Sequence, residues 1–221
     1  MKKIYIIGAG GFGREVAWLI ERINSVEPAW KLCGFLDDAP EKQGTMEGKH
    51  RIVGGCDFLR HLEEESWCVC AVGSAAARRR IIEKIRKFDN ACVKFATLID
   101  PSVMMSSSVA VGKGSILCAG AILTVDVTIG EHVIVNLDCT IGHDVQIGDF
   151  VTLYPSVNVS GCVVVEQGAE LGTGSLVIQG KRVGGETIVG AGGVVIGDLP
   201  GGCTAVGVPV RIIKRKGENE G

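Results

Sequence analysis

The residues best suited to chemistry in this sequence are His143 and its neighbour Asp144. An imidazole titrates near neutral pH, so it can take a proton from an amine or a hydroxyl group. Gly161 follows 18 residues after His143, and a glycine leaves its backbone N–H open to a ligand. A base beside such a donor suits a transfer reaction in which an oxyanion must be held. The alternative is a solvated surface histidine.

A second group lies near the N-terminus, where glycines fall at Gly8, Gly10 and Gly13. They stand between an apolar run at residues 3–7 and a segment with helical spacing at residues 14–23. Backbone N–H groups at a helix N-terminus hold phosphate groups, so this context predicts a site for a diphosphate.

Asp37 and Asp38 follow the next apolar run, residues 30–36. Either carboxylate could accept a hydrogen bond from a ribose hydroxyl or a base N–H. The alternative is a tight structural turn with solvated aspartates. The pattern itself does not separate NAD from a nucleotide sugar.

The elements that position His143 follow a repeat of six residues. Stepping by six from Ile99 reaches an aliphatic residue or methionine seventeen times in succession, ending at Val195. Strand side chains alternate, so positions i, i+4 and i+6 share a face, and this period predicts a parallel β-helix. Three hexads make one triangular coil, and stacked coils bury the apolar side chains. A β-sandwich, the alternative, does not hold one phase for so long.

The phase of the repeat separates inward from outward positions. His143, Asp144 and Asn136 fall off the core face, and Gly161 is expected one coil along, beside His143. Lys181 breaks the apolar pattern at an inward position. It indicates either a local opening of the coil, which we favour, or a contact with a phosphate group.

Before the repeat, strand-like and helix-like segments alternate, which predicts a small parallel α/β domain. Strands are expected at residues 3–7, 30–36, 67–72 and 92–98, helices at 14–23, 56–62 and 75–88, and a polar loop at 39–50. The expected architecture is thus an α/β Rossmann-like domain at residues 1–97, a β-helix at 98–212 and a polar tail at 213–221.

The composition excludes several classes of function. The net charge of −2 gives no basic surface for nucleic acid. The nine cysteines lack CxxC pairs and metal-type spacing, so we expect no metal site and a reducing, cytoplasmic setting. No signal peptide is expected, and no apolar run approaches the ~20 residues that span a bilayer. The other histidines, His50, His61 and His132, are expected at the surface.

The chain resembles the bacterial nucleotide-sugar acetyltransferases of the left-handed β-helix superfamily. That group holds the 4-amino-sugar N-acetyltransferases of bacillosamine-type pathways and the sialic acid O-acetyltransferases (PglD/NeuD-like). The stretches that carry the resemblance are Gly8-Ala9-Gly10-Gly11-Phe12-Gly13, Phe35-Leu36-Asp37-Asp38, Ala71-Val72-Gly73-Ser74, Asn136 through Gly148, Val159-Ser160-Gly161 and Gly207-Val208-Pro209.

The resemblance implies a homotrimer with acetyl-CoA in the grooves between adjacent left-handed β-helices. It implies that His143 is the general base, that Asp144 supports it, and that Gly161 offers its N–H to the acetyl carbonyl. Asn136 matches a polar residue near that histidine. The nucleotide sugar, expected as a UDP sugar, would lie on the first domain with its sugar reaching toward His143. The implied contacts are Gly8, Gly10, Gly11, Phe12, Gly13, Asp37, Asp38, Gly73 and Ser74.

Two departures leave the acceptor open. Some members have histidines where this chain has Phe12 and Thr152. The expected activity is transfer of acetyl from acetyl-CoA to an amino group by direct attack, without an acyl-enzyme. The alternatives are O-acetylation of a sugar such as a sialic acid, a non-catalytic nucleotide-binding scaffold, and NAD-dependent redox chemistry.

Overall fold

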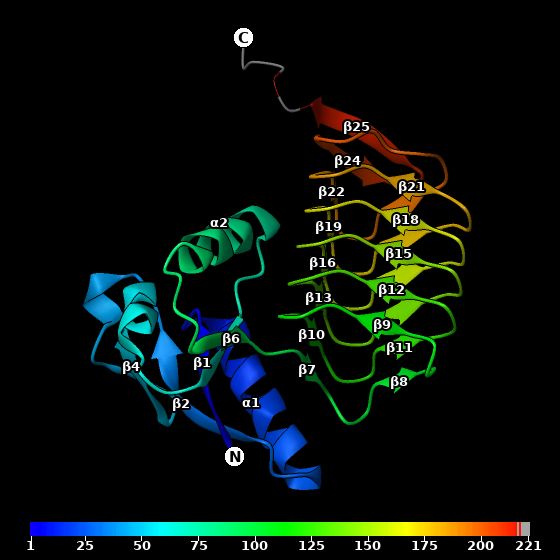
Figure 1. Cartoon of the computed structure of the whole chain (residues 1–221). Helices are drawn as coiled ribbons and strands as arrows, with labels where there is room; N and C mark the ends of the chain where they lie inside the picture. Colours follow the sequence, from blue (N-terminus) through cyan, green and yellow to red (C-terminus); the bar gives the residue numbers. More distant parts are fainter. Residues whose placement is uncertain (216, 218–221) are drawn as a thin grey trace. The chain divides into compact units, whose positions relative to one another are not determined.

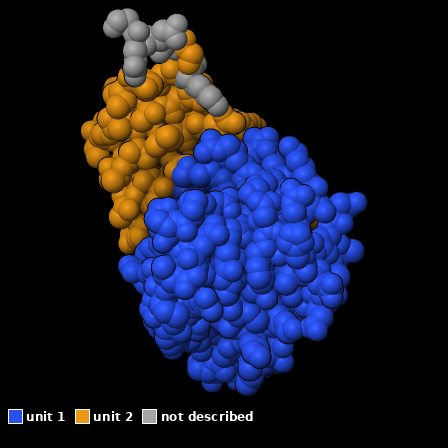
Figure 2. All heavy atoms as spheres, turned by 90° about the vertical axis from the view of Figure 1, so that its left-hand side faces the viewer, with its two compact units in different colours: residues 1–101 blue, residues 102–221 orange. Residues whose placement is uncertain are grey.

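The computed structural model describes residues 1–215 and 217 and divides the chain into two compact units, Met1–Pro101 and Ser102–Gly221 (Figures 1 and 2). The division falls slightly later than the boundary expected from the hexads. Near this division Arg22 binds the buried carboxylate of Asp100 through Nε (2.5 Å) and Nη2 (2.9 Å). This pair joins the end of unit 1 to α1. Among the described residues, no helix combines the length and apolarity needed to cross a bilayer.

Unit 1 is an α/β layer built on one sheet with the order β3-β4-β2-β1-β5-β6. Its strands are parallel except for the hairpin between β3 and β4. The strands are β1 (Lys2–Ile7), β2 (Trp30–Leu36), β3 (Met46–Glu47), β4 (His50–Gly54), β5 (Ser66–Cys70), β6 (Val93–Phe95) and β7 (Leu98–Ile99), the last outside this sheet. The helices are α1 (Gly11–Val26), α2 (Ala75–Arg86) and the 3-10 turns Pro40–Lys42 and Cys56–His61.

The alternation of strands and helices expected for unit 1 is confirmed, with one correction. Residues 39–50, expected as a loop, hold a 3-10 turn, strand β3 and the start of β4. The polar, short edge strand β3 lacks the apolar run that marks a buried strand. The strongest signals were the buried run Ile4–Ile7 and the apolar stripe of α1, whose Val16, Leu19 and Ile20 face the sheet side and are buried.

Unit 2 is a parallel β-helix whose coils stack through two-residue strands (Figure 1). Each strand pairs with the strand one coil further on, as Thr140 does with Asn158. These strands form three faces. The first face carries β10 (Ile116–Leu117), β13 (Ile134–Val135), β16 (Thr152–Leu153), β19 (Glu170–Leu171) and β22 (Ile188–Val189). The second carries β8 (Met104–Met105), β11 (Ile122–Leu123), β14 (Thr140–Ile141), β17 (Asn158–Val159), β20 (Leu176–Val177) and β23 (Val194–Val195), and the third carries β9 (Ala110–Val111), β12 (Thr128–Ile129), β15 (Gln146–Ile147), β18 (Val164–Val165) and β21 (Arg182–Val183).

The inward positions of the hexads form the core of unit 2. From Leu117 to Val195 every sixth residue is buried, and so are the residues four positions on from Ser115 to Ser175. Met105 departs from this pattern, with 43% of its surface exposed. Its strand is the last of its sheet, so no further coil stacks on it.

Each coil turns at a residue with positive φ in one fixed position of the hexad. Glycines take this position at 114, 120, 168, 174, 180 and 192, and other residues at 126, 132, 138, 144, 150, 156, 162 and 186. The left-handed conformation costs an L-residue about 1–2 kcal/mol. Stacking of the coils fixes this turn, and the corner side chains therefore form columns with a spacing of one coil.

Two expectations about the C-terminal part are corrected. The coil does not open at Lys181, because its carbonyl accepts the Val164 N–H (3.0 Å) and Arg182 pairs with Val164 across the ladder. Residues 213–215, expected in the polar tail, belong to β25 (Val210–Arg215), which pairs antiparallel with β24 (Cys203–Gly207). This pairing satisfies backbone groups whatever the side chains are. Residues 216 and 218–221 lie outside the described part.

Candidate functional site

His143 lies in the turn after β14, with about half of its side chain exposed. Its Nδ1 is 2.8 Å from Oδ2 of Asp144. An ionised carboxylate can only accept a hydrogen bond, so Nδ1 carries the proton and Nε2 keeps its lone pair. The pair thus presents Nε2 as a base.

The imidazole of His143 lies against Gly161, at the position that the repeat predicts. A Cβ on Gly161 would stand 2.6 Å from Cε1 and 2.9 Å from Cδ2 of the ring, and closer still to Nε2. Only glycine leaves room for the ring in this orientation. Among the described residues no acceptor is recorded for the Gly161 N–H.

Cys162 is a neighbour of His143 that the sequence analysis missed, and it has no part in the proposed chemistry. Its Sγ is 4.0 Å from Nδ1 of His143, and its backbone N–H donates to the His143 carbonyl (2.8 Å). Cys162 stands one coil after Asp144 in the same corner column, and this spacing is the signal that could have found it. The thiol and the carboxylate approach the same ring nitrogen, so the three residues do not form a relay in which the imidazole activates the thiol.

A groove of about 260 Å³ adjoins this pair of residues. Gly142 and Ser160 line it, and each directly precedes a residue of the site, His143 and Gly161. Strands of the same face supply the rest of its lining: Ile122, Thr124, Thr140, Ile141, Asn158 and Val159. The groove therefore ends next to the backbone of His143 and Gly161.

Asn136 is nearly buried, with 9% of its surface exposed. Its side-chain oxygen accepts the Leu137 N–H (2.8 Å). No hydrogen bond is recorded between Asn136 and His143 in the described part of the chain. Thr152, which stands where some members have a second histidine, is buried inside unit 2 and presents no base.

The glycine loop of unit 1 divides its glycines between two roles. Gly8 has a φ of +101°, and a Cβ on Gly13 would collide with the Gly8 carbonyl, so these two glycines shape the turn. A Cβ on Gly10 would meet nothing within 4 Å, and one on Gly11 only the tip of Arg14 at 3.9 Å. Helix α1 begins at Gly11, so the glycines with open space beside them lie at its N-terminus, the position expected for a phosphate.

Phe12 lies in the first turn of α1 and is partly exposed. Its position next to Gly11 and Gly13 agrees with a place beside the glycine loop, where its apolar ring can offer only a packing contact.

Asp37 closes the glycine loop. One carboxylate oxygen accepts the Ala9 N–H (3.2 Å) and the Lys42 ammonium group (3.0 Å), and the other accepts the Ala39 N–H (3.0 Å). Partial burial alone would raise the pKa of Asp37, but these three donors outweigh it and hold that pKa below its ordinary value. Much of its hydrogen-bonding capacity is thus used within the protein.

Asp38 is bound in a similar way. Its Oδ1 accepts the Cys56 N–H (2.6 Å) and its Oδ2 lies 3.2 Å from the Lys84 ammonium group. Burial opposes ionisation here too, and the Cys56 N–H and Lys84 lower the pKa of Asp38 overall. Asp37 therefore supports the glycine loop, whereas Asp38 joins the turn after β2 to Cys56 and Lys84.

Gly73 and Ser74 lie between β5 and α2. The Ser74 hydroxyl accepts the Ala77 N–H (3.5 Å) and so caps α2. Arg78, fully buried, donates from Nη1 to the carbonyls of Val72 (2.7 Å) and Gly73 (2.9 Å). This guanidinium fixes the loop that packs on Gly8. The triple arginine in the sequence did not reveal which member turns inward.

The remaining histidines correct one expectation. His132, expected at the surface, is fully buried and stacks on Phe150, one coil away, with ring centroids 5.3 Å apart. His50 is partly buried, which lowers its pKa, and His61 is exposed, as expected. None of the three lies in the cluster around His143.

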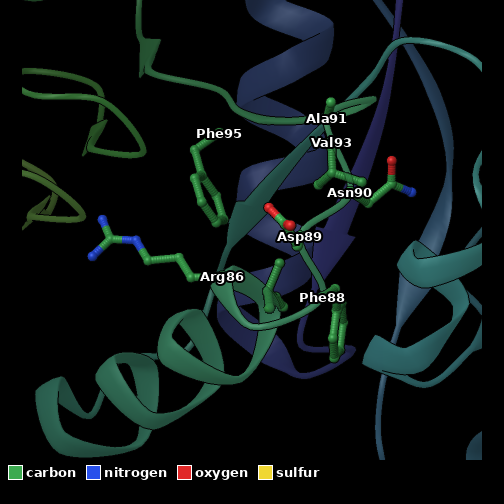
Figure 3. Close-up of a pocket in the computed structure, with 8 residues that line it drawn as sticks. Arg86, Phe88, Asp89, Asn90, Ala91, Val93 and Phe95 are labelled. Atoms are coloured by element: carbon green, nitrogen blue, oxygen red, sulfur yellow. The ribbon is translucent and has the colours of Figure 1, made fainter.

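A separate pocket of about 200 Å³ lies at the end of α2 opposite Ser74 (Figure 3). Asp89 and Arg86 lie at its edge, and Phe88 and Phe95 supply apolar walls. Phosphate-binding loops of parallel sheets lie at the carboxyl ends of the strands, whereas this pocket lies where β6 begins. It is therefore not part of the predicted nucleotide site.

Comparison with known proteins follows the same division of the chain. A family model described as the PglD N-terminal domain matches residues 3–85. The chain is 37% identical over 123 residues to UDP-N-acetylbacillosamine N-acetyltransferase of Bacillus subtilis (strain 168). The matched segment covers 54% of this chain and 52% of that protein. The match thus spans about half the length of this curated relative.

Two solved structures match nearly the whole chain. One is a histidine-to-asparagine mutant of perosamine N-acetyltransferase from Caulobacter crescentus in complex with CoA and GDP-perosamine. It is 30% identical with a TM-score of 0.84, covering 97% of this chain and 98% of that one. The other is the acetyltransferase domain of PglB from Neisseria gonorrhoeae in complex with acetyl coenzyme A, 30% identical with a TM-score of 0.83, covering 96% and 99%.

Proposed function

Because the chain belongs to the PglD/NeuD-like family of left-handed β-helix sugar acetyltransferases, we propose that it transfers the acetyl group of acetyl-CoA to an amino group of a nucleotide-linked amino sugar. The relatives compared above are N-acetyltransferases, which favours an amine acceptor over a hydroxyl. One is named for a UDP sugar and one is bound to a GDP sugar. The experiment that tests the proposal therefore uses both UDP-linked and GDP-linked sugars.

The observation that carries this proposal is the relation of His143 to Asp144 and Gly161. Nδ1 is held by the Asp144 carboxylate, so Nε2 is the atom that accepts a proton. Gly161 lies against the ring, and we propose that its N–H holds the oxygen of a tetrahedral intermediate.

The reaction then proceeds by direct attack. The amine nitrogen forms a bond to the thioester carbonyl carbon while Nε2 of His143 takes a proton from the nitrogen. The C–S bond breaks, and the proton passes from the imidazolium to the sulfur of CoA. No side chain is acylated, which agrees with the position of Cys162 on the wrong ring nitrogen for activation.

The groove beside Gly142 and Ser160 is the path we propose for the acyl end of acetyl-CoA. We further propose that the protein is a homotrimer with CoA between adjacent β-helices. The outward residues Met104 and Ile122, on the face that carries the groove, are exposed and apolar, which supports an interface there. Asn136 is proposed to act through its NH₂ group, because its oxygen already accepts the Leu137 N–H.

The nucleotide sugar is proposed to bind unit 1. The open space at Gly10 and Gly11 and the first turn of α1 suit the diphosphate. Phe12, Asp37, Asp38, Gly73 and Ser74 are proposed as further contacts of the nucleotide sugar. For Asp37 we also propose a supporting role, because it accepts the Ala9 N–H of the glycine loop.

The test is a screen of UDP- and GDP-linked amino sugars, with the acetylated product identified by mass and CoA release measured. His143→Ala is expected to lower kcat by about 10²–10⁴-fold while CoA still binds. His61→Ala, which removes a histidine of unit 1, should leave kcat unchanged. Wild-type activity in His143→Ala would refute the role of the base. Acetylation of hydroxyl sugars alone, or no CoA release with any acceptor, would refute the proposed reaction.

A further inference from the structure

We propose that His143, Asp144 and Cys162 form an inhibitory site for Zn²⁺, a role separate from acetyl transfer. Each residue offers one ligand atom, these atoms all lie within 4.8 Å of one another, and all three side chains are exposed. Zinc is commonly bound by three protein ligands with the fourth position open to water. The cluster supplies one nitrogen, one oxygen and one sulfur.

The distances in the cluster are close to those that zinc requires. Nδ1 of His143 lies 2.8 Å from Oδ2 of Asp144 and 4.0 Å from Sγ of Cys162. With bond lengths of about 2.0–2.3 Å, two ligand atoms on a tetrahedral ion are about 3.3–3.6 Å apart. The thiol must approach by about half an ångström, and exposed side chains achieve this by small rotations.

The backbone holds the three residues in place. Asp144 and Cys162 occupy the same corner position in neighbouring coils, with φ values of 58° and 59°. The Cys162 N–H donates to the His143 carbonyl (2.8 Å), so the two corners are joined directly. The site therefore needs no rearrangement of the coil.

The ligand set selects the metal. Thiolate and imidazole suit zinc, whereas Mg²⁺ and Ca²⁺ prefer oxygen ligands. A thiolate beside an imidazole thus predicts sensitivity to Zn²⁺ and insensitivity to Mg²⁺.

The consequence for catalysis follows from the place of Nδ1. A metal on Nδ1 displaces the contact by which the Asp144 carboxylate holds the ring, and it ties the imidazole to Asp144 and Cys162. The imidazole is then a metal ligand, so we expect bound zinc to inhibit the reaction without filling the groove. This inhibition rests on the proposed function, whereas metal binding does not.

The experiment combines activity with a spectroscopic measurement that needs no substrate. Co²⁺ added to the metal-free wild-type protein should produce a thiolate-to-cobalt charge-transfer band, which Cys162→Ser should lose. Zn²⁺ should inhibit the wild type, and Cys162→Ser should require at least about tenfold more, since even the loss of an outer-sphere partner weakens metal binding about 10–100-fold. In EDTA, Cys162→Ser should match the wild type in kcat.

Cys92→Ser is the matched control, because Cys92 is another partly exposed thiol and lies in unit 1. It should keep both the band and the zinc sensitivity. Absence of the band in the wild type, or equal zinc inhibition of wild type and Cys162→Ser, would overturn the proposal. A band lost in Cys162→Ser, in a protein inactive toward every sugar, would uphold the metal site and refute the proposed function instead.

Discussion

The ring of His143 occupies the space in which any other residue at position 161 would place its Cβ. Gly161 thereby admits the imidazole, which a larger residue would displace. The repeat makes this possible because the two residues stand one coil apart.

Gly161→Ala is expected to lower kcat by about 10²–10³-fold with little change in stability. The new Cβ would meet the end of a half-exposed side chain, which can swing outward, so folding is spared and the base is displaced. Gly197→Ala is the control, because a Cβ there meets nothing within 4 Å. Kinetics together with thermal unfolding measure both effects. A loss of stability that accounts for the lost activity would contradict this role.

Gly10→Ala and Gly13→Ala should separate binding from folding in the glycine loop. A Cβ on Gly13 collides with a backbone carbonyl, so this variant should unfold more readily, by about 2 kcal/mol or more. A Cβ on Gly10 meets only open space and should leave stability within about 0.5 kcal/mol while raising the KM for the nucleotide sugar. Chemical denaturation and steady-state kinetics test the pair. An unchanged KM in Gly10→Ala would argue against a diphosphate at this position.

Arg78→Met should destabilise unit 1 by about 2–5 kcal/mol, because the carbonyls of Val72 and Gly73 lose a fully buried donor. Arg79→Met, one residue along the same helix, loses an exposed pair with Glu83 and should cost about 0.5 kcal/mol or less. Urea unfolding of both variants checks the difference. Equal stabilities would mean that the buried guanidinium does not fix the loop.

Asp37 should make the stability of the protein depend on pH. Its folded-state pKa lies below the ordinary value of 3.8, so its contribution is complete above that value and is lost as the pH falls through the folded pKa. Asp37→Asn should therefore be less stable than wild type at pH 7, by about 1–2 kcal/mol, and the gap should narrow in acid. Denaturation at a series of pH values between about 7 and 3 measures the gap. A gap that stays constant would contradict the ionised role of Asp37.

The sequence was sufficient to predict the stacking of Gly161 on His143, because the hexad phase is a geometric measure that holds over the whole coil. It was insufficient for His132 and Cys162. Their surroundings are set by the residue one coil away in the same corner, Phe150 for one and Asp144 for the other. Taken in steps of one coil, the corner positions align His132 with Phe150 and Asp144 with Cys162, so the sequence does contain the signal for these two contacts.

In unit 1 the limits of prediction were different. The strands and helices follow from apolar periodicity, but periodicity does not distinguish Arg78 from Arg79, although one is buried and the other exposed. That choice depends on which carbonyls the loop after β5 turns inward. In the same way, the pattern placed Asp37 and Asp38 near the glycine loop without revealing that their oxygens are already bound.

The pairing of each strand with the strand one coil onward has a consequence for how such a protein changes length. Thr140 faces Asn158, and the same interval of 18 residues joins His143 to Gly161. Insertion or deletion of one complete coil after the site would preserve every neighbour before it and restore the register after it. A change of six residues would instead rotate the remaining chain onto the next face. The β-helix can thus be lengthened or shortened, by evolution or by design, in steps of one whole coil.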